Sequence, residues 1–161
     1  MATSQIIAAL AHHPFLDGLQ PAHLDKLASL AFEITFEPDQ VIFREGDPSS
    51  LFYLILSGRV AVEVAAPGRF ITIQTIGEGE ELGWSSLLDQ VNKQFRARCV
   101  EPVRALAFDG TRLTAEFECD HEFGYMLLRK VLATVAERLR ATRLQMLDVY
   151  ASKSAKGEVS Q

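Results

Sequence analysis

Between residues 31 and 109, short runs of alternating apolar and polar positions follow one another along the chain. The run Phe32-Glu-Ile-Thr-Phe shows the pattern, because alternation with a period of two is typical of a half-buried β-strand. Turn residues such as Gly46, Gly58 and Pro67 separate the runs. Many short strands at this spacing predict a β-sandwich or a jelly-roll β-barrel. The six further strand-like runs lie at 41–43, 51–56, 60–64, 70–76, 95–100 and 103–108.

Segments with helical periodicity flank the barrel. The segment from Pro21 to Leu30 predicts a helix, because Leu24 and Leu27 share a face with Leu30 and a helix start tolerates proline. Residues 111–150 predict further helix, since they contain no proline and no glycine after Gly124. The expected fold class is therefore mainly β with flanking helices: a jelly-roll β-barrel followed by a long C-terminal helix.

The same patterns predict one domain over residues 1–150. The short polar tail at 151–161 has no apolar periodicity, and we expect it to be disordered. Within the domain we expect N-terminal helices at 1–30, the barrel at 31–109 and C-terminal helices at 111–150.

The last predicted helix carries a heptad pattern. Its apolar positions are separated alternately by four and three residues, which is the spacing of a coiled-coil seam. The alternative is a helix that packs only on its own barrel. We favour a parallel helix–helix homodimer, with a seam formed by Leu128, Leu132, Val135, Leu139, Thr142, Met146 and Val149.

Composition narrows the class of protein. The 161-residue chain has a formal net charge of −5, which argues against nucleic-acid binding, because that requires basic surface. No 18-residue apolar stretch is present, so no membrane span is expected. The first ten residues lack the basic start and apolar run of a signal peptide, and a cytoplasmic protein is the expectation.

The histidines argue against a metal enzyme. Metal-dependent jelly-roll enzymes place two or three histidines on their barrel strands. None of the four histidines here, which are His12, His13, His23 and His121, lies in the predicted barrel. Two cysteines alone cannot complete a zinc or iron–sulfur site. We therefore expect neither a metal nor another resident cofactor, and a protein that is not an enzyme.

One stretch of the predicted barrel resembles a known family. The sequence Glu45-Gly-Asp-Pro-Ser-Ser-Leu-Phe-Tyr-Leu-Ile-Leu-Ser-Gly-Arg-Val-Ala-Val resembles the cyclic-nucleotide-binding-domain family, and in particular the sensor domains of catabolite-activator (Crp/Fnr-like) regulators. The resemblance covers roughly residues 15–150. It implies a jelly-roll sensor domain. In those regulators a helix-turn-helix follows the long helix, whereas only eleven residues follow Tyr150, so no DNA-binding domain is expected here.

The family's phosphate-binding loop reads Phe-Gly-Glu-Leu-Ala-Leu and, after a spacer, Arg-x-Ala-Thr. The corresponding segment begins Leu82-Gly-Trp-Ser-Ser, and Gly83 matches the family glycine. Trp84 stands at the position of the ribose-binding glutamate. Ungapped alignment puts Lys93 at the position of the phosphate-binding arginine and Arg96 at that of the threonine; a shift of three residues instead gives Arg96 the arginine role.

These departures predict weak or absent cAMP binding. An indole only donates a hydrogen bond where a carboxylate accepts, and an ammonium lacks the bidentate fork of a guanidinium. Trp84 is interpreted either as a stacking platform or as a core or interface filler. Arg96 and Arg98 share one strand face, which points either into the barrel or to solvent. The candidate ligand-binding residues are Gly83, Trp84, Ser85, Ser86, Lys93, Arg96 and Arg98.

The sequence thus predicts a regulatory sensor module. It would bind a small anionic or nucleotide-like ligand in the barrel and signal through its C-terminal helix to a protein partner. The alternative is a ligand-free dimeric scaffold whose pocket is degenerate.

Overall fold

The computed structural model describes residues 2–89 and 91–157. The chain divides between Met126 and Leu127 into two compact units, whereas the sequence places residues 1–150 in one domain. The elements are α1 (Thr3–His12), η1 (Pro14–Leu16), α2 (Pro21–Leu30), β1 (Phe32–Phe36), β2 (Val41–Phe43), β3 (Leu51–Ser57), β4 (Val60–Ala66), β5 (Arg69–Ile76), β6 (Glu81–Leu82), η2 (Trp84–Leu87), β7 (Arg96–Cys99), β8 (Val103–Asp109), α3 (Gly110–Cys119) and α4 (His121–Gly157).

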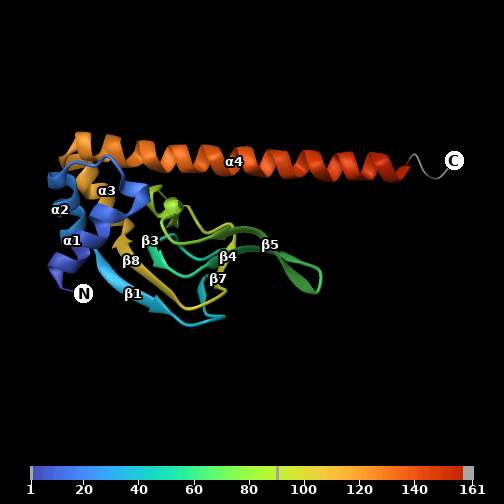
Figure 1. Cartoon of the computed structure of the whole chain (residues 1–161), viewed down its shortest axis with the longest axis horizontal. Coiled ribbons are helices and arrows are strands. Elements are labelled where there is room, and N and C mark those ends of the chain that lie inside the picture. The colour runs from blue at the N-terminus through green and yellow to red at the C-terminus, as the bar shows by residue number, and fades with distance from the viewer. Residues whose placement is uncertain (1, 90, 158–161) are drawn as a thin grey trace. The chain divides into compact units, whose positions relative to one another are not determined.

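The strands of the first unit form two antiparallel four-stranded sheets (Figure 1). Their orders are β1-β8-β3-β6 and β2-β7-β4-β5, so neighbours in each sheet come from distant parts of the chain. This arrangement confirms the predicted jelly-roll barrel with flanking helices.

The barrel core fills the space between the two sheets. Strand β3 is buried on both faces, so its side chains read as a nearly continuous apolar run. Tyr53 and Ile55 point to the core between the sheets, together with Val62 of β4 and Ala97 of β7. The alternate residue Phe52 points the other way and contacts other aromatic rings.

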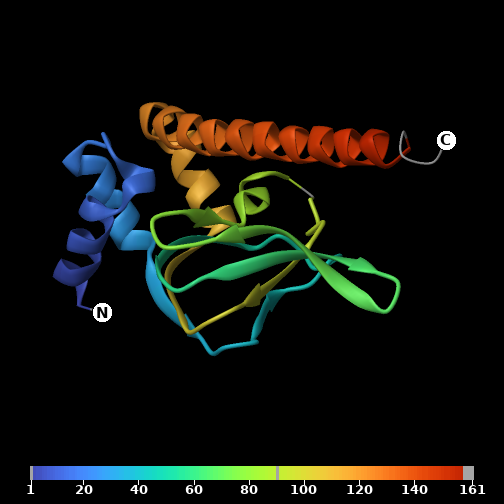
Figure 2. The ribbon, with the colours of Figure 1, turned by 45° about the vertical axis from the view of Figure 1, so that its right-hand side comes forward.

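The N-terminal helices pack against this second face of β3. The ring of Phe15 lies 5.9 Å from that of Phe52, which lies 6.2 Å from that of Phe108. A buried histidine ties the same segment to the sheet, since His13 Nε2 lies 3.0 Å from the carbonyl oxygen of Ile55. Figure 2 shows α1 and α2 in blue beside the strands at one end of the barrel.

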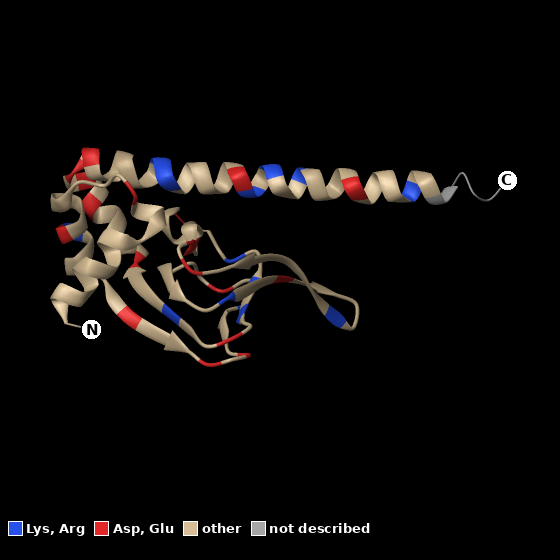
Figure 3. Ribbon diagram, viewed as in Figure 1, with Lys and Arg blue, Asp and Glu red and all other residues tan. Residues whose placement is uncertain are grey.

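Helix α4 is longer than predicted. It continues to Gly157, so the expectation of a disordered tail from residue 151 is wrong for 151–157; residues 158–161 lie outside the described residues. Acidic and basic residues are interspersed along it (Figure 3), and Arg140 pairs with Glu137 at 3.1 Å. No helix within 2–89 and 91–157 combines the length and the hydropathy that a bilayer crossing requires.

Candidate ligand-binding site

A tight turn at Gly83 begins the candidate site. Gly83 follows β6 and precedes η2 with a φ of 87°, in the left-handed region that favours glycine. A Cβ at this position would lie 2.6 Å from the carbonyl oxygen of Leu51 and 3.3 Å from Nζ of Lys93. The glycine therefore lets the loop approach both β3 and the lysine more closely than any side chain allows.

Backbone hydrogen bonds hold Lys93 in place. Its N–H donates to the carbonyl oxygen of Asp47, and its own carbonyl accepts from the N–H of Gly46, both over 2.8 Å. The side chain is only 5% exposed. Its Nζ donates to Ser85 Oγ over 3.1 Å and lies 4.4 Å from the ring centroid of Phe43. The loop after Gly83 and the segment around Lys93 thus meet at one ammonium group.

Burial dominates the electrostatics of this ammonium group. Loss of solvation lowers the pKa of Lys93 to about 8, although the negative charge of Glu81 partly opposes the shift. The hydroxyl that receives the hydrogen bond of Lys93 also lies 2.9 Å from Ser49 Oγ. At neutral pH the site therefore presents a positive charge that donates to a neutral hydroxyl and lies in the field of the buried Glu81.

A cavity of about 250 Å³ opens beside Lys93. Four of its lining residues are polar or charged and four are apolar or aromatic, so the cavity combines polar groups with an apolar wall. The polar and charged ones are Asp47, Ser50, Tyr53 and Lys93; the others are Ile42, Phe43, Pro48 and Leu51.

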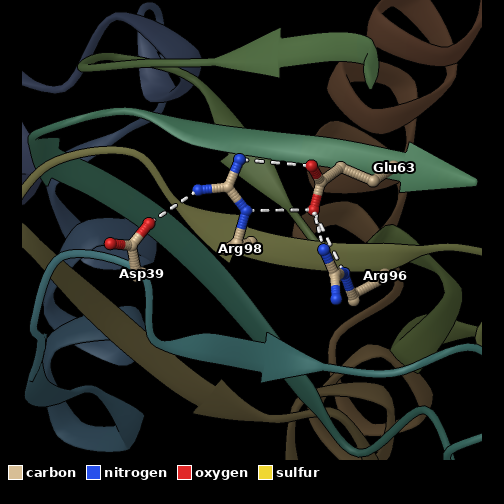
Figure 4. Close-up of polar contacts among 4 residues, drawn as sticks. All are labelled: Asp39, Glu63, Arg96 and Arg98. Atoms are coloured by element: carbon tan, nitrogen blue, oxygen red, sulfur yellow. Dashed lines mark hydrogen bonds and ion pairs between the residues drawn. The ribbon is translucent and has the colours of Figure 1, made fainter. Parts of the chain in front are cut away.

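Arg96 and Arg98 belong to a different cluster (Figure 4). Arg96 Nη2 lies 2.8 Å from Glu63 Oε1, and Arg98 donates to the same carboxylate over 3.2 Å. Arg98 also reaches Asp39 at 2.9 Å. The guanidinium of Arg96 lies 3.2 Å above the ring centroid of Phe70. Both predicted anion ligands are therefore engaged by acidic partners.

The orientation of Arg96 and Arg98 decides between the two interpretations of their strand face. As predicted, Arg96 and Arg98 share a strand face. The intervening Ala97 and the following Cys99 lie in the barrel core, so the arginine face is the outer one. The interpretation that points either guanidinium into the barrel is wrong, because the register pairs β7 with β4 so that Arg96 lies opposite Glu63.

The remaining predicted residues form the short helix η2. Trp84 is partly exposed, and Ser86 is buried with its Oγ donating to the carbonyl oxygen of Gly83 over 2.8 Å. The same helix touches the start of α3, since a Cβ at Gly110 would lie 2.3 Å from the carbonyl oxygen of Ser86. Of the candidate residues, the structure brings Gly83, Ser85 and Lys93 together and sets Arg96 and Arg98 apart.

Sequence reasoning missed several residues of this region. Glu81 lies in β6 and is fully buried, although it follows a polar, glycine-containing segment that is typical of a solvated loop. Tyr53 and Phe43 line the cavity, and their positions in apolar strands indicate burial but not a cavity. Glu63 is the acidic member of an otherwise apolar strand, and that exception was the available signal for an ion-pair partner.

The fold and the site define a class of protein. An antiparallel jelly-roll barrel with flanking helices, in which a glycine-dependent loop and a buried cation lie beside an open cavity, has the architecture of a regulatory sensor module. A family description of the cyclic nucleotide-binding domain matches residues 33–118, which is more than half of the chain. The chain therefore belongs to the cyclic nucleotide-binding domain family.

Known proteins similar to this chain are mainly regulators. The CRP-like cAMP-activated global transcriptional regulator of Mycobacterium tuberculosis is 28% identical over 141 residues; the match covers 87% of this chain and 61% of that regulator. The N-terminal domain of a transcriptional regulator from Streptomyces coelicolor has a TM-score of 0.67 at 27% identity, with 86% of this chain and 94% of that one covered. The catabolite activator protein of Thermus thermophilus has a TM-score of 0.69 at 28% identity, with 86% and 63% covered.

Proposed function

We propose that this chain is a regulatory sensor that binds a small anionic ligand in its barrel cavity and reports it to a protein partner. The observation that carries the proposal is the buried Lys93 ammonium beside the cavity, in the segment that aligns with the family's phosphate-binding loop. A buried cation is costly unless anions or dipoles compensate it, and an anionic ligand in the cavity would add to the compensation that Glu81 and Ser85 provide. The proposal requires neither a resident metal nor catalysis.

The cAMP ligand named for a relative cannot be assigned directly to this chain. The Mycobacterium tuberculosis regulator is described as cAMP-activated, but here Trp84 offers no acceptor for a ribose hydroxyl. Lys93 offers a point charge without a bidentate fork, and Arg96 is committed to Glu63. We propose weak or absent cAMP binding as part of this function.

The second part of the proposal is that α4 passes the signal to the partner. The predicted seam positions Leu128, Leu132, Leu139, Met146 and Val149 are all exposed large apolar side chains. Single chains seldom leave such a continuous apolar strip in water. A second copy of the chain that pairs along this seam would bury it and form a two-fold symmetric dimer.

We place this activity in the cytoplasm. Cys99 and Cys119 are both free thiols, which suits a reducing compartment. Basic residues outnumber acidic ones on α4 (Figure 3), but the chain as a whole has a formal net charge of −5, which favours a protein partner over nucleic acid.

A thermal-shift panel tests ligand binding. Phosphate, cAMP and cyclic dinucleotides would be compared on the wild type and on Lys93→Met, since a ligand raises stability by RT ln(1 + [L]/Kd). Lys153→Met, at an exposed position of α4, is the matched control. A shift that Lys93→Met abolishes and Lys153→Met retains supports the proposal. No shift with any small anion would favour the ligand-free scaffold instead.

A further inference from the structure

The cavity beside Lys93 limits the charge of its ligand. Lys93 is the single cation among its lining residues, and Arg96 and Arg98 lie on the opposite face of their strand, paired with Glu63. The one lining carboxylate, Asp47, accepts the N–H of Arg44 within its own turn over 2.9 Å. A backbone N–H leaves the negative charge of Asp47 in place, so the cavity has no excess of positive charge that could compensate a phosphate dianion, and it suits a monoanion better.

The hydroxyl of a tyrosine that lines the same cavity has no hydrogen-bond partner among the described residues. Tyr53 is 6% exposed, and no residue in the described part of the chain forms a hydrogen bond with its hydroxyl. Burial raises the pKa of Tyr53 to about 12, so the hydroxyl keeps its proton and is a donor at neutral pH. Because no described residue accepts this proton, the hydroxyl is available to donate a hydrogen bond. A ligand oxygen would supply that acceptor.

The walls and the size of the cavity limit the uncharged part of the ligand. Phe43 and Tyr53 supply aromatic surface, and Ile42 and Leu51 supply aliphatic surface. Aromatic side chains favour offset-stacked or edge-to-face packing with a planar ring. The volume of about 250 Å³ lies below the range of sites that hold drug-sized ligands, which begins at about 300 Å³. A compact ligand with one flat apolar ring satisfies both conditions.

We infer that the cavity binds a small aromatic monocarboxylate, whose carboxylate accepts hydrogen bonds from Lys93 and Tyr53 and whose ring packs against Phe43 and the apolar wall. This inference rests on the proposed function, because it names the ligand class of the same anion site. Ser85 would remain the second acceptor for the ammonium group of Lys93, and no cyclic phosphate or ribose is required.

Isothermal titration calorimetry with benzoate tests the inference. Benzamide, which keeps the ring but lacks the charge, and cyclohexanecarboxylate, which keeps the charge but lacks the flat ring, are the matched ligands. We expect benzoate to bind more tightly than both. Tyr53→Phe removes only the hydroxyl and should weaken benzoate binding about tenfold. Lys93→Met should abolish measurable binding, and Lys153→Met should leave it unchanged.

The outcomes separate the inference from the proposed function. Phosphate or cAMP binding that depends on Lys93, without benzoate binding, overturns the inference and leaves the sensor proposal standing. Benzamide binding as tightly as benzoate, or Tyr53→Phe binding benzoate as the wild type does, also overturns the inference. Binding of no anion at all overturns both. Circular dichroism of each variant confirms that a loss of binding is not a loss of fold.

Discussion

Lys93 Nζ donates its hydrogen bond to the neutral hydroxyl of Ser85 over 3.1 Å, so a buried ammonium group is held without a carboxylate on that bond. Burial lowers its pKa from 10.5 to about 8. The folded state therefore carries the full cost of burying this charge below pH 8. This cost disappears as pH rises from about 8 to 10.5, because the lysine of the folded chain loses its proton while that of the unfolded chain keeps it.

Lys93→Met should consequently stabilise the ligand-free protein by about 1 kcal/mol at pH 7, because it removes a buried charge and keeps an apolar stem. The gain should shrink as pH rises from 8 to 10. Urea unfolding at pH 7 and pH 9.5 measures both effects. Lys153→Met should show neither effect. A Lys93→Met protein that is less stable than the wild type at pH 7 would contradict the electrostatic reading of this site.

The carboxylate of Glu63 balances two guanidinium groups on the outer face of the barrel. Burial by itself raises the pKa of Glu63, but the hydrogen bonds and charges of Arg98 and Arg96 outweigh it and hold the pKa below its usual value. The stabilisation is therefore complete above pH 4.5 and is lost as pH falls through the lowered pKa. Glu63→Gln should cost about 3 kcal/mol of unfolding free energy at pH 7, because the buried partner of both arginines loses its charge.

Glu101→Gln is the control for this substitution. Glu101 pairs with Arg59 at 3.0 Å, but both side chains are exposed, so the loss should stay below about 1 kcal/mol. Equal costs for the two substitutions, measured by chemical denaturation, would show that burial does not strengthen the Glu63 cluster.

His13 makes the docking of the N-terminal segment sensitive to acid. Its Nδ1 accepts the N–H of Phe15 over 3.3 Å, so its Nε2 carries the proton donated to the carbonyl oxygen of Ile55. Burial lowers the pKa of His13 below 6.5, against the opposing effects of that carbonyl and of Glu78. Its contribution to stability is therefore complete above pH 6.5 and is lost as pH falls through the lowered pKa.

His13→Gln should flatten the fall in stability between pH 7.5 and pH 5. His12→Gln, at the neighbouring exposed histidine, should retain the dependence of the wild type. Urea midpoints at three pH values distinguish the variants. If His13→Gln follows the same pH curve as the wild type, a different group governs the acid response.

Gly83→Ala tests whether the loop depends on close approach. The alanine would occupy a left-handed backbone conformation and would overlap the carbonyl oxygen of Leu51. Gly46→Ala has the same backbone strain, with φ of +86°, but no atom lies within 4 Å of its Cβ. We expect Gly83→Ala to cost about 2 kcal/mol more than Gly46→Ala, because overpacking adds to strain. Thermal unfolding of both variants measures the difference, and equal losses would place the requirement in backbone conformation alone.

Leu139→Glu tests the homodimer along α4. Leu139 is 49% exposed on the proposed seam, and a charge there should separate the two helices into folded monomers. Leu147→Glu places the same charge at a 63% exposed position off the seam and should leave the dimer intact. Multi-angle light scattering at tens of micromolar reports the mass. A monomeric wild type, or a dimeric Leu139→Glu protein, would exclude this interface.

Local periodicity was sufficient to predict most of the barrel. The bounds of β1, β2 and α2 agree with their predicted ranges, because strand alternation and the proline at a helix start are local signals. Strand β6 has two residues and shows no period, so no local pattern marks Glu81 as a buried strand residue. Charged side chains are seldom buried, so the residue type gives no such indication either.

The site was harder to predict because its contacts are distant in sequence. Arg96 meets Glu63 across 33 positions, and only the pairing of β7 with β4 reveals which face the arginines occupy. The shared face of Arg96 and Arg98 follows from a period of two, but the direction of that face does not. Tyr53 offered no chemical pattern at all, since a tyrosine in an apolar strand looks like core.

The missing side chain at Gly110 makes the joint between η2 and α3 stiff. The two backbones lie so close that no side chain separates them and no rotamer change can take up a displacement. A displacement of the η2 backbone at Ser86 would therefore press directly on the main chain of the first turn of α3. Side chains do not separate the two backbones at this joint, so even a small shift at Ser86 would displace the main chain of α3.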